Sequence, residues 1–179
     1  MKQSSPKGLL LTALLLLICI ASFAQSSKPS QPKYADMIGA NPAADADIKL
    51  VSDYLNAIIN DVDKATAMLA ADYKGFGPGP DDSATIQQIN ETWKKSNSTQ
   101  ANRKTEFLPE TFNVKSGDLE GHWVSTWGTY SFSQNGKDVK VPFQFTARVK
   151  NGKINRSVVY YDQLAIMKTL GFTVTPPAN

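Results

Sequence analysis

Asp162 is the residue of this sequence whose surroundings most favour acid–base chemistry. It ends a predicted strand at residues 154–162, and it falls in line with two tyrosines, Tyr130 and Tyr160. A carboxylate on an apolar face has a raised pKa unless it is paired, because burial disfavours its charged form. Such groups are frequent in functional sites, so Asp162 is a candidate catalytic acid or base.

A structural role for Asp162 stays open beside the catalytic one. A helical pattern begins at Gln163, directly after this carboxylate. An aspartate in that position commonly accepts hydrogen bonds from the first backbone N–H groups and so caps the helix. The two roles can coexist in one side chain.

The other reactive residue types are scarce. His122 is the one histidine, and no histidines, cysteines and carboxylates recur with the spacing of metal ligands. We therefore expect neither a metal site nor a cofactor. His122 should lie at the opposite end of the sheet from Asp162, roughly 26 Å away along the strand direction, so the two cannot share a proton.

Residues 1–24 have the pattern of a secretory signal peptide. Lys2 and Lys7 precede an apolar stretch at residues 9–21, and Ser22-Phe23-Ala24 provides the small residues of a cleavage site. The apolar stretch is shorter than the roughly 20 residues that span a bilayer. We expect an exported, periplasmic or secreted mature chain that retains no membrane segment.

Two alternatives stay open for this N-terminal segment, an uncleaved anchor and a lipid attached to Cys19, the only cysteine. Removal of Lys2 and Lys7 would leave 17 of the 19 basic residues against 16 acidic ones. Such a balanced charge is not the footprint of a protein that binds nucleic acid or an anionic membrane. We therefore expect no nucleic-acid partner.

The remaining chain divides into a leader, one domain and a tail. Residues 25–44 are rich in Ser, Gln, Lys and Pro, which predicts a flexible leader. A domain follows at 45–172, and a short tail at 173–179. Helical spacing of apolar residues and polar capping residues predict three helices, which begin near residues 45–47, 61–63 and 83.

After these helices the apolar pattern changes from a helical period to a period of two. It predicts strands at residues 104–115, 122–133, 139–150 and 154–162. Two Asn-Gly pairs, Asn135-Gly136 and Asn151-Gly152, link the last three, and this pair is a strong signal for a tight hairpin. Helices followed by an antiparallel meander predict an α+β fold with the helices on one face of the sheet.

Two-residue turns at both Asn-Gly pairs fix which strand residues face each other. Val141 then opposes Tyr130 on one side and Asp162 on the other, and Phe143 opposes Tyr160. Trp123 and Trp127 fall on the other face of the sheet, with Trp123 opposite Arg148. Two tryptophans on a half-polar face favour a subunit contact, and stray aromatic residues on a solvated face are the alternative.

Several short stretches, in their order and spacing, resemble the nuclear transport factor 2-like superfamily, especially its SnoaL-like branch. They are Asp61–Ala65, Leu69–Tyr73, Phe76–Pro78, Trp127–Thr129, Asn151–Ile154, Tyr161–Gln163 and Leu170–Gly171. The resemblance implies a cone-shaped fold, in which three N-terminal helices pack on a strongly curved sheet around an internal pocket, and it implies homodimers.

The resemblance also implies roles for single residues. In SnoaL-like cyclases an aspartate near the end of the last strand acts as acid or base, and Asp162 matches that position. Those enzymes carry a histidine on the preceding strand, whereas this chain has Gln144, Thr146 and Arg148 there. In the isomerases a tyrosine and a neutral carboxyl group bind an enolate, and Tyr130, Tyr160 and Asp162 form a similar grouping.

The missing histidine favours binding over catalysis. We predict an exported domain whose apolar pocket binds a small apolar ligand without chemistry. The expected lining is Tyr54, Trp93, Tyr130, Phe143 and Tyr160. The alternatives are a cofactor-independent isomerase, cyclase or dehydratase that uses Asp162, and an interaction protein whose cone is filled.

Overall fold

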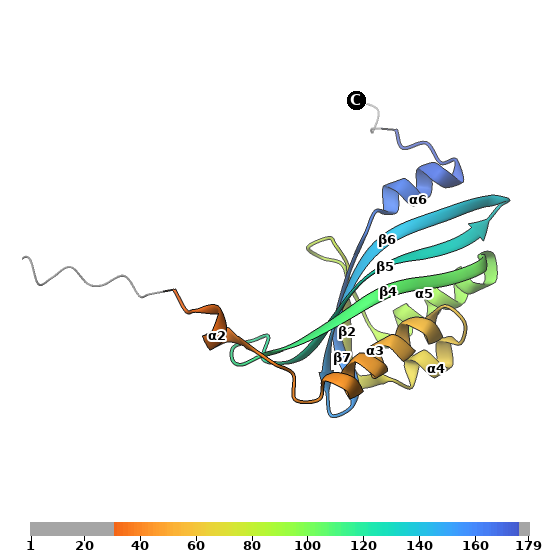
Figure 1. Cartoon of the computed structure of the whole chain (residues 1–179). Helices are drawn as coiled ribbons and strands as arrows, with labels where there is room; N and C mark the ends of the chain where they lie inside the picture. The colour runs from red at the N-terminus through yellow and green to blue at the C-terminus, as the bar shows by residue number, and fades with distance from the viewer. Residues whose placement is uncertain (1–30, 176–179) are drawn as a thin grey trace, which may run out of the picture. The chain divides into compact units, whose positions relative to one another are not determined.

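Four long antiparallel strands form the centre of a curved sheet (Figure 1). The computed structural model describes residues 31–175, so the predicted signal peptide lies outside the described residues. The unit that begins at Tyr34 is the one described below. Its central strands are β4 (Ala101–Val114), β5 (Gly121–Gln134), β6 (Lys137–Lys150) and β7 (Lys153–Tyr161).

Short strands extend the sheet at both edges. They are β1 (Ile38–Gly39), β2 (Leu69–Phe76) and β3 (Ser83–Ala84), and the strand order is β1-β4-β5-β6-β7-β2-β3. β2 runs parallel to β7, and the other pairs are antiparallel. The long central strands are antiparallel, as the sequence predicts, and the parallel pairing of β2 with β7 makes the sheet mixed.

Three helices cover one face of the sheet, as the sequence predicts (Figure 1). They are α3 (Ala44–Ile58), α4 (Val62–Thr66) and α5 (Ile86–Thr99). Asp61 caps α4 by accepting a hydrogen bond from Lys64 N, and Thr85 forms a capping box with Gln88 at the start of α5. The predicted α+β, cone-like fold is confirmed.

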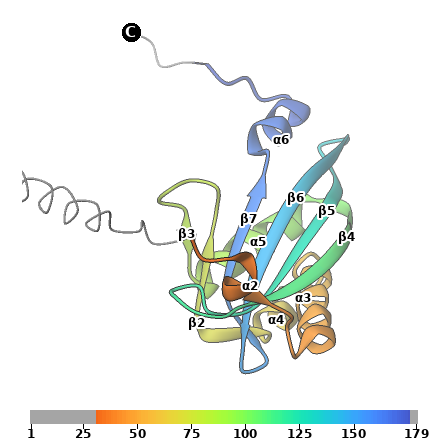
Figure 2. The same ribbon diagram turned by 60° about the vertical axis from the view of Figure 1, so that its left-hand side comes forward.

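Two further helices lie at the ends of the unit. α2 (Tyr34–Met37) leads into β1, and β7 leads directly into α6 (Gln163–Leu170), as Figure 2 shows. Ordered structure thus begins before residue 45, inside the segment expected to be a flexible leader, because Ile38 pairs with Val114 of β4. No helix within residues 31–175 is long and apolar enough to cross a membrane.

The face that α3, α4 and α5 cover is called the inner face here, and the opposite one the outer face. Apolar side chains gather on the inner face in two clusters. The larger lies under these three helices and includes Val124, Phe145 and Ile154. The smaller lies under α6 and consists of Phe132, Val139 and Val141, with Ile166 and Leu170 packed against it.

The pairing of β5 with β6 has the predicted register. Val141 opposes Tyr130, and Trp123 opposes Arg148. The hairpin between β6 and β7 also begins as predicted, with Lys150 opposite Lys153. Its Asn151 and Gly152 both have positive φ, of 52° and 68°, as a two-residue turn of this type requires.

A β-bulge then shifts the second half of β7 by one residue. Val149 pairs with Ile154 but Arg148 pairs with Arg156, so Asn155 is the extra residue. The predicted pairs of Phe143 with Tyr160 and of Val141 with Asp162 are therefore wrong.

Phe143 pairs with Tyr161, and Phe145 pairs with Val159. Every side chain of β7 after the bulge lies on the face opposite to the predicted one.

Candidate functional site

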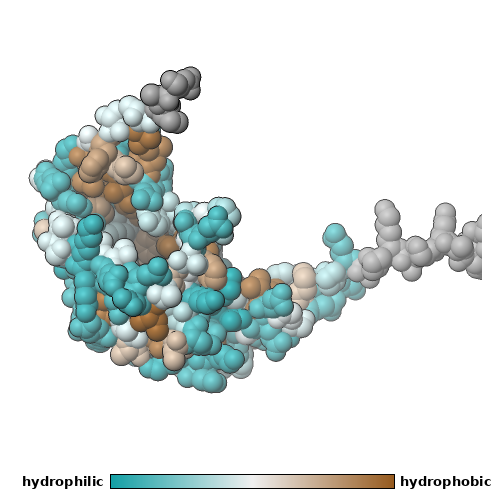
Figure 3. Space-filling view, turned by 180° about the vertical axis from the view of Figure 1, so that it is seen from behind, coloured by the Kyte–Doolittle hydropathy of each residue, from teal (hydrophilic) through white to brown (hydrophobic). Residues whose placement is uncertain are grey.

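The inner face has a half-buried stretch between its two buried clusters. Phe145 on β6 is 6% exposed, and Phe132 on β5 is 3% exposed. Between them lie Gly128, Tyr130 and Phe143, all of intermediate burial, and Trp93 of α5 packs against the same region. Figure 3 shows the molecule from behind, where the surface is hollowed below the end that carries α6 and hydrophobic side chains gather at that end.

We call this region the inner opening and define it by Trp93, Gly128, Tyr130, Phe143 and Tyr161. The glycine contributes to its shape. A Cβ at Gly128 would lie 2.5 Å from the Glu106 carbonyl oxygen and 3.0 Å from the Phe143 ring. Only a residue without a side chain lets β4 and β5 approach each other here.

Aromatic contacts order the side chains around the opening. The Trp93 and Tyr130 rings meet edge to face with centroids 5.8 Å apart, and Tyr130 lies 5.2 Å from Phe132. The Tyr130 hydroxyl donates a hydrogen bond to Gln100 Oε1 at 2.7 Å. Burial raises the pKa of Tyr130 to about 12, although the Arg103 guanidinium acts in the opposite direction. Tyr130 is therefore a neutral phenol at physiological pH.

A second pair of tyrosines lies deeper in the cone. Tyr54 of α3 stacks on Phe145 with centroids 5.7 Å apart, and burial together with Tyr73 on β2 raises the pKa of Tyr54. Tyr73 Oη lies 2.7 Å from Ser157 Oγ of β7. Burial raises the pKa of both tyrosines, and Ser157 partly opposes the rise at Tyr73. Tyr54 and Tyr73 are therefore buried, protonated phenols, and neither acts as a base at neutral pH.

Asp162 does not lie in the cone. Its Oδ1 accepts a hydrogen bond from Ala165 N at 2.8 Å, and it is the N-cap of α6. It borders a shallow depression of about 410 Å³ that is lined by outer-face residues, among them Trp127 and Tyr160, and also by Phe143 and Tyr161 of the inner opening. The bulge at Asn155 turns Tyr160 to the outer face, so Tyr160 does not share a face with Tyr130 as the sequence predicts. Asp162 adjoins Phe143 and Tyr161 instead.

Four of the six predicted site residues do lie on the inner face or against it. Trp93, Tyr130 and Phe143 border the opening, and Tyr54 lies below it. Tyr160 is 53% exposed on the outer face. Tyr161, which pairs with Phe143, takes the inward position that the sequence assigns to Tyr160.

A polar cluster that the sequence interpretation missed lies at the start of α3. Asp47 of α3 is 5% exposed, and its Oδ2 lies 3.2 Å from His122 Nδ1 and accepts a hydrogen bond from Asn41 Nδ2 at 2.8 Å. Val51 and Val124, both fully buried, separate this cluster from the tyrosines.

A signal for this cluster exists in the sequence. Asp47 precedes Val51 by four residues and Tyr54 by seven, which places a carboxylate on the apolar stripe of α3. A buried acid in such a position needs a partner, and His122 supplies it. Among residues 31–175, no three histidine, cysteine or carboxylate side chains gather closely enough to hold a metal ion.

Solved structures with this arrangement of elements are numerous. The chain is similar to a protein from Catenulispora acidiphila with a ketosteroid isomerase-like fold, solved in complex with trimethylamine. The sequence identity is 17% and the TM-score 0.55, and the match covers 72% of this chain and 98% of that one. It is also similar to a protein from Shewanella putrefaciens described as a SnoaL-like polyketide cyclase, at 16% identity and a TM-score of 0.55 over 70% of this chain and 96% of that one. The chain has the nuclear transport factor 2-like fold.

A third neighbour with this nuclear transport factor 2-like fold is an epoxide hydrolase from M. tuberculosis, with 19% identity, a TM-score of 0.50 and coverage of 72% of this chain and 92% of that one. The predicted resemblance is thereby confirmed at the level of the fold, and its solved neighbours include SnoaL-like proteins. A comparison with protein-family models finds no match, and neither does a comparison with curated protein sequences. Proteins with one fold can have different activities, so the function must be inferred from the residues of the site.

The capping role of Asp162 leads to a prediction about stability. Asp162→Ala should lower the free energy of unfolding by about 1 kcal/mol, because Ala165 N loses its acceptor, whereas Asp162→Asn should be nearly silent. Urea denaturation measures both changes. Asp81→Ala, in an exposed loop, is the control and should change stability by only a few tenths of a kcal/mol. Equal losses for the Asn and Ala variants would contradict a capping role.

Proposed function

We propose that this chain is a non-catalytic binding domain that holds a small apolar or aromatic ligand in the inner opening. The observation that carries the proposal is the half-buried aromatic stretch between two fully packed clusters on the same face. Trp93, Tyr130, Phe143 and Tyr161 provide ring faces and edges for such a ligand. Apolar pockets with a few placed polar groups are the usual sites of small-molecule binding.

The polar groups at the opening suit hydrogen bonding. The Tyr130 hydroxyl donates to Gln100 and keeps its lone pairs, so it can accept a hydrogen bond from a ligand hydroxyl. Because burial raises its pKa to about 12, it does not ionise in the physiological range. A neutral ligand with a hydrogen-bond donor therefore suits this site.

Acid–base catalysis receives less support. None of the five residues that define the opening is a carboxylate or a histidine, and Asp162, the predicted catalyst, caps α6 on the outer side. The buried Asp47–His122 pair lies beyond Val51 and Val124. A general base must come within hydrogen-bond reach of the proton that it removes. Asp162 adjoins Phe143 and Tyr161, but its Oδ1 already accepts a hydrogen bond from Ala165 N.

Binding of 2-naphthol, a two-ring phenol, tests the proposal. Phe143→Ala should weaken its binding about tenfold or more, because the loss of one aromatic wall removes about 1.5–3 kcal/mol of apolar contact. Phe143→Leu keeps most of the apolar volume and should retain most of the affinity. Calorimetric titration gives the dissociation constants.

Leu119→Ala is the matched control for this test, because Leu119 is 51% exposed and lies outside the inner opening. It should leave the affinity unchanged. Equal weakening by Leu119→Ala and Phe143→Ala would mean that the probe binds exposed apolar surface, and the proposed site would then be wrong.

We also propose that the outer face forms a homodimer contact. Leu108, Trp127, Gln144 and Tyr160 oppose one another in one row across β4 to β7, and the three apolar members are 72%, 45% and 53% exposed. Contiguous exposed apolar surface favours association, and a two-fold axis pairs one such row with its copy. Trp123 contributes less, because it is 5% exposed and its Nε1 donates to Leu119 O.

Sedimentation velocity tests the homodimer. Trp127→Ser combined with Tyr160→Ser should shift the protein toward monomer, because the apolar row loses its two rings. Leu119→Ser, at an exposed position off the row, should leave the association state unchanged. An unchanged dimer in the double variant would place the contact on another surface.

Export is the third part of the proposal, and it is supported by the charged, apolar and small-residue pattern of residues 1–24. Expression in a bacterial host with intact-mass analysis of the exported fraction tests it. The mass should correspond to a chain that begins at Gln25. Retention of Met1, or a lipid on Cys19, would contradict signal cleavage.

A further inference from the structure

Two arginines face each other on the outer face, near the turn that joins β6 to β7. Arg148 of β6 directly opposes Arg156 of β7, a pairing that exists because of the bulge at Asn155. Aromatic rings flank the pair, since the Arg148 guanidinium lies 5.7 Å from the Trp123 ring centroid and that of Arg156 lies 4.1 Å from Phe76. Like charges directly opposite each other on neighbouring strands are destabilising, so this arrangement calls for a compensating anion.

No carboxylate within residues 31–175 forms an ion pair with either arginine. Arg148 donates from Nε to Asn155 Oδ1 at 3.1 Å and has only long contacts, of 3.4 and 3.5 Å, to the carbonyl oxygens of Asp118 and Glu120. Arg156 Nε is buried without an acceptor. Buried donors without partners cost free energy, and an arginine normally satisfies them with a carboxylate or a phosphate.

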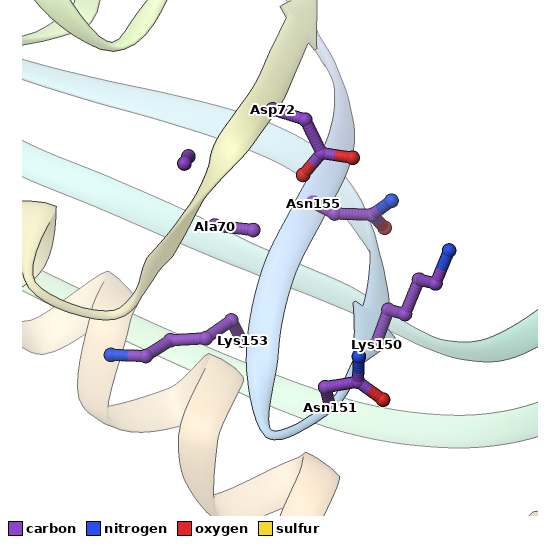
Figure 4. A pocket seen from close by; sticks show the side chains of 7 residues that line it. Ala70, Asp72, Lys150, Asn151, Lys153 and Asn155 are labelled. Carbon is purple, nitrogen blue, oxygen red and sulfur yellow. The ribbon is translucent and has the colours of Figure 1, made fainter.

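A depression of about 340 Å³ adjoins this arginine pair. Asp72, Lys150, Lys153 and Asn155 contribute to its lining. Figure 4 shows the polar ends of Asp72, Lys150 and Asn155 on one side of β7, whereas Lys153 extends to the other side. Asn155 connects the depression to the arginines, because its side chain lines the depression and accepts a hydrogen bond from Arg148.

Lys74 adds a fourth cation to this surface, since it pairs with Arg156 across β2 and β7 and is exposed. The cations of the surface are thus Lys74, Arg148, Lys150 and Arg156, and Asp72 is the one carboxylate that lines the depression.

We propose that this outer surface is an oxyanion site, which binds the carboxylate or phosphate group of a ligand between Arg148 and Arg156. Guanidinium groups bind both oxyanions with paired hydrogen bonds.

Lys150 and the Asn155 amide extend the oxyanion site toward the depression. The site lies on the face opposite the inner opening, so it does not depend on the function proposed above. Asp72 repels an oxyanion and marks the edge of the site.

The chain offers a direct spectroscopic test, because it contains only three arginines, Arg103, Arg148 and Arg156. Protein labelled with ¹⁵N-arginine gives one Nε–H signal for each. Arg103 is an internal control, since its Nε donates to Ile59 O at 2.7 Å on the inner face. Titration with sodium phosphate at constant ionic strength should move the Arg148 and Arg156 signals to saturation and leave that of Arg103 in place.

Acetate and chloride, used at the same ionic strength, distinguish the possible ligands. Saturable shifts with phosphate alone identify a phosphoryl site, and shifts with acetate alone identify a carboxylate site. The proposal is overturned if neither anion moves the two signals, or if chloride moves them equally, which would indicate screening of charge alone.

Charge variants that leave both arginines in place complete the test. Lys150→Gln should weaken binding of the effective anion about tenfold, because one charge-assisted contact is lost. Asp72→Asn should strengthen it. Lys95→Gln removes the same charge from α5 and should have no effect; weakening equal to that of Lys150→Gln would show long-range electrostatics and overturn the site.

Discussion

The extra residue at Asn155 determines which side chains of β7 face the helices. Its Oδ1 accepts a hydrogen bond from Arg148 Nε, so the bulged position is tied to the neighbouring strand rather than left free. Beyond it, Ser157, Val159 and Tyr161 share a face with Ala147, Phe145 and Phe143. The hydroxyl of Ser157 then meets Tyr73, and Tyr161 reaches the rim of the inner opening. One local irregularity thereby sets the composition of both faces.

Burial controls the chemistry that the cone can perform. Tyr54, Tyr73 and Tyr130 all have pKa values above that of a free phenol, chiefly because burial disfavours the phenolate. A protonated phenol donates or accepts a hydrogen bond but does not remove a proton at neutral pH. The carboxylate that would have to cooperate with them caps α6 instead. The inner face therefore presents protonated phenols as hydrogen-bond donors and acceptors.

The sequence predicts the elements of this fold well, because their signals are local. Helical periodicity identifies α3 and α5, and the Asn135-Gly136 turn fixes the register of β5 with β6. The bulge escapes this reasoning, since Val158, Val159, Tyr160 and Tyr161 supply an apolar residue to either face in either register. The inward positions of Tyr130 and Phe143, which depend on β5 and β6 alone, are predicted correctly, whereas those of Tyr160 and Asp162 are not. The parallel pairing of β2 and the Asp47–His122 contact depend on long-range packing.

Arg156 nevertheless distinguishes the two possible registers of β7, which the aromatic residues do not. In a register without the bulge it would oppose Ala147, which is fully buried against the helices, and a guanidinium would enter the apolar core. The desolvation of an unpaired charge costs several kcal/mol, far more than a bulge. The shifted register moves Arg156 to the outer face, where Phe76 stacks on it, but it also places Arg156 opposite Arg148. The same constraint that keeps the inner face apolar thus concentrates positive charge on the outer one, and an anion bound there would stabilise the register that forms the inner opening.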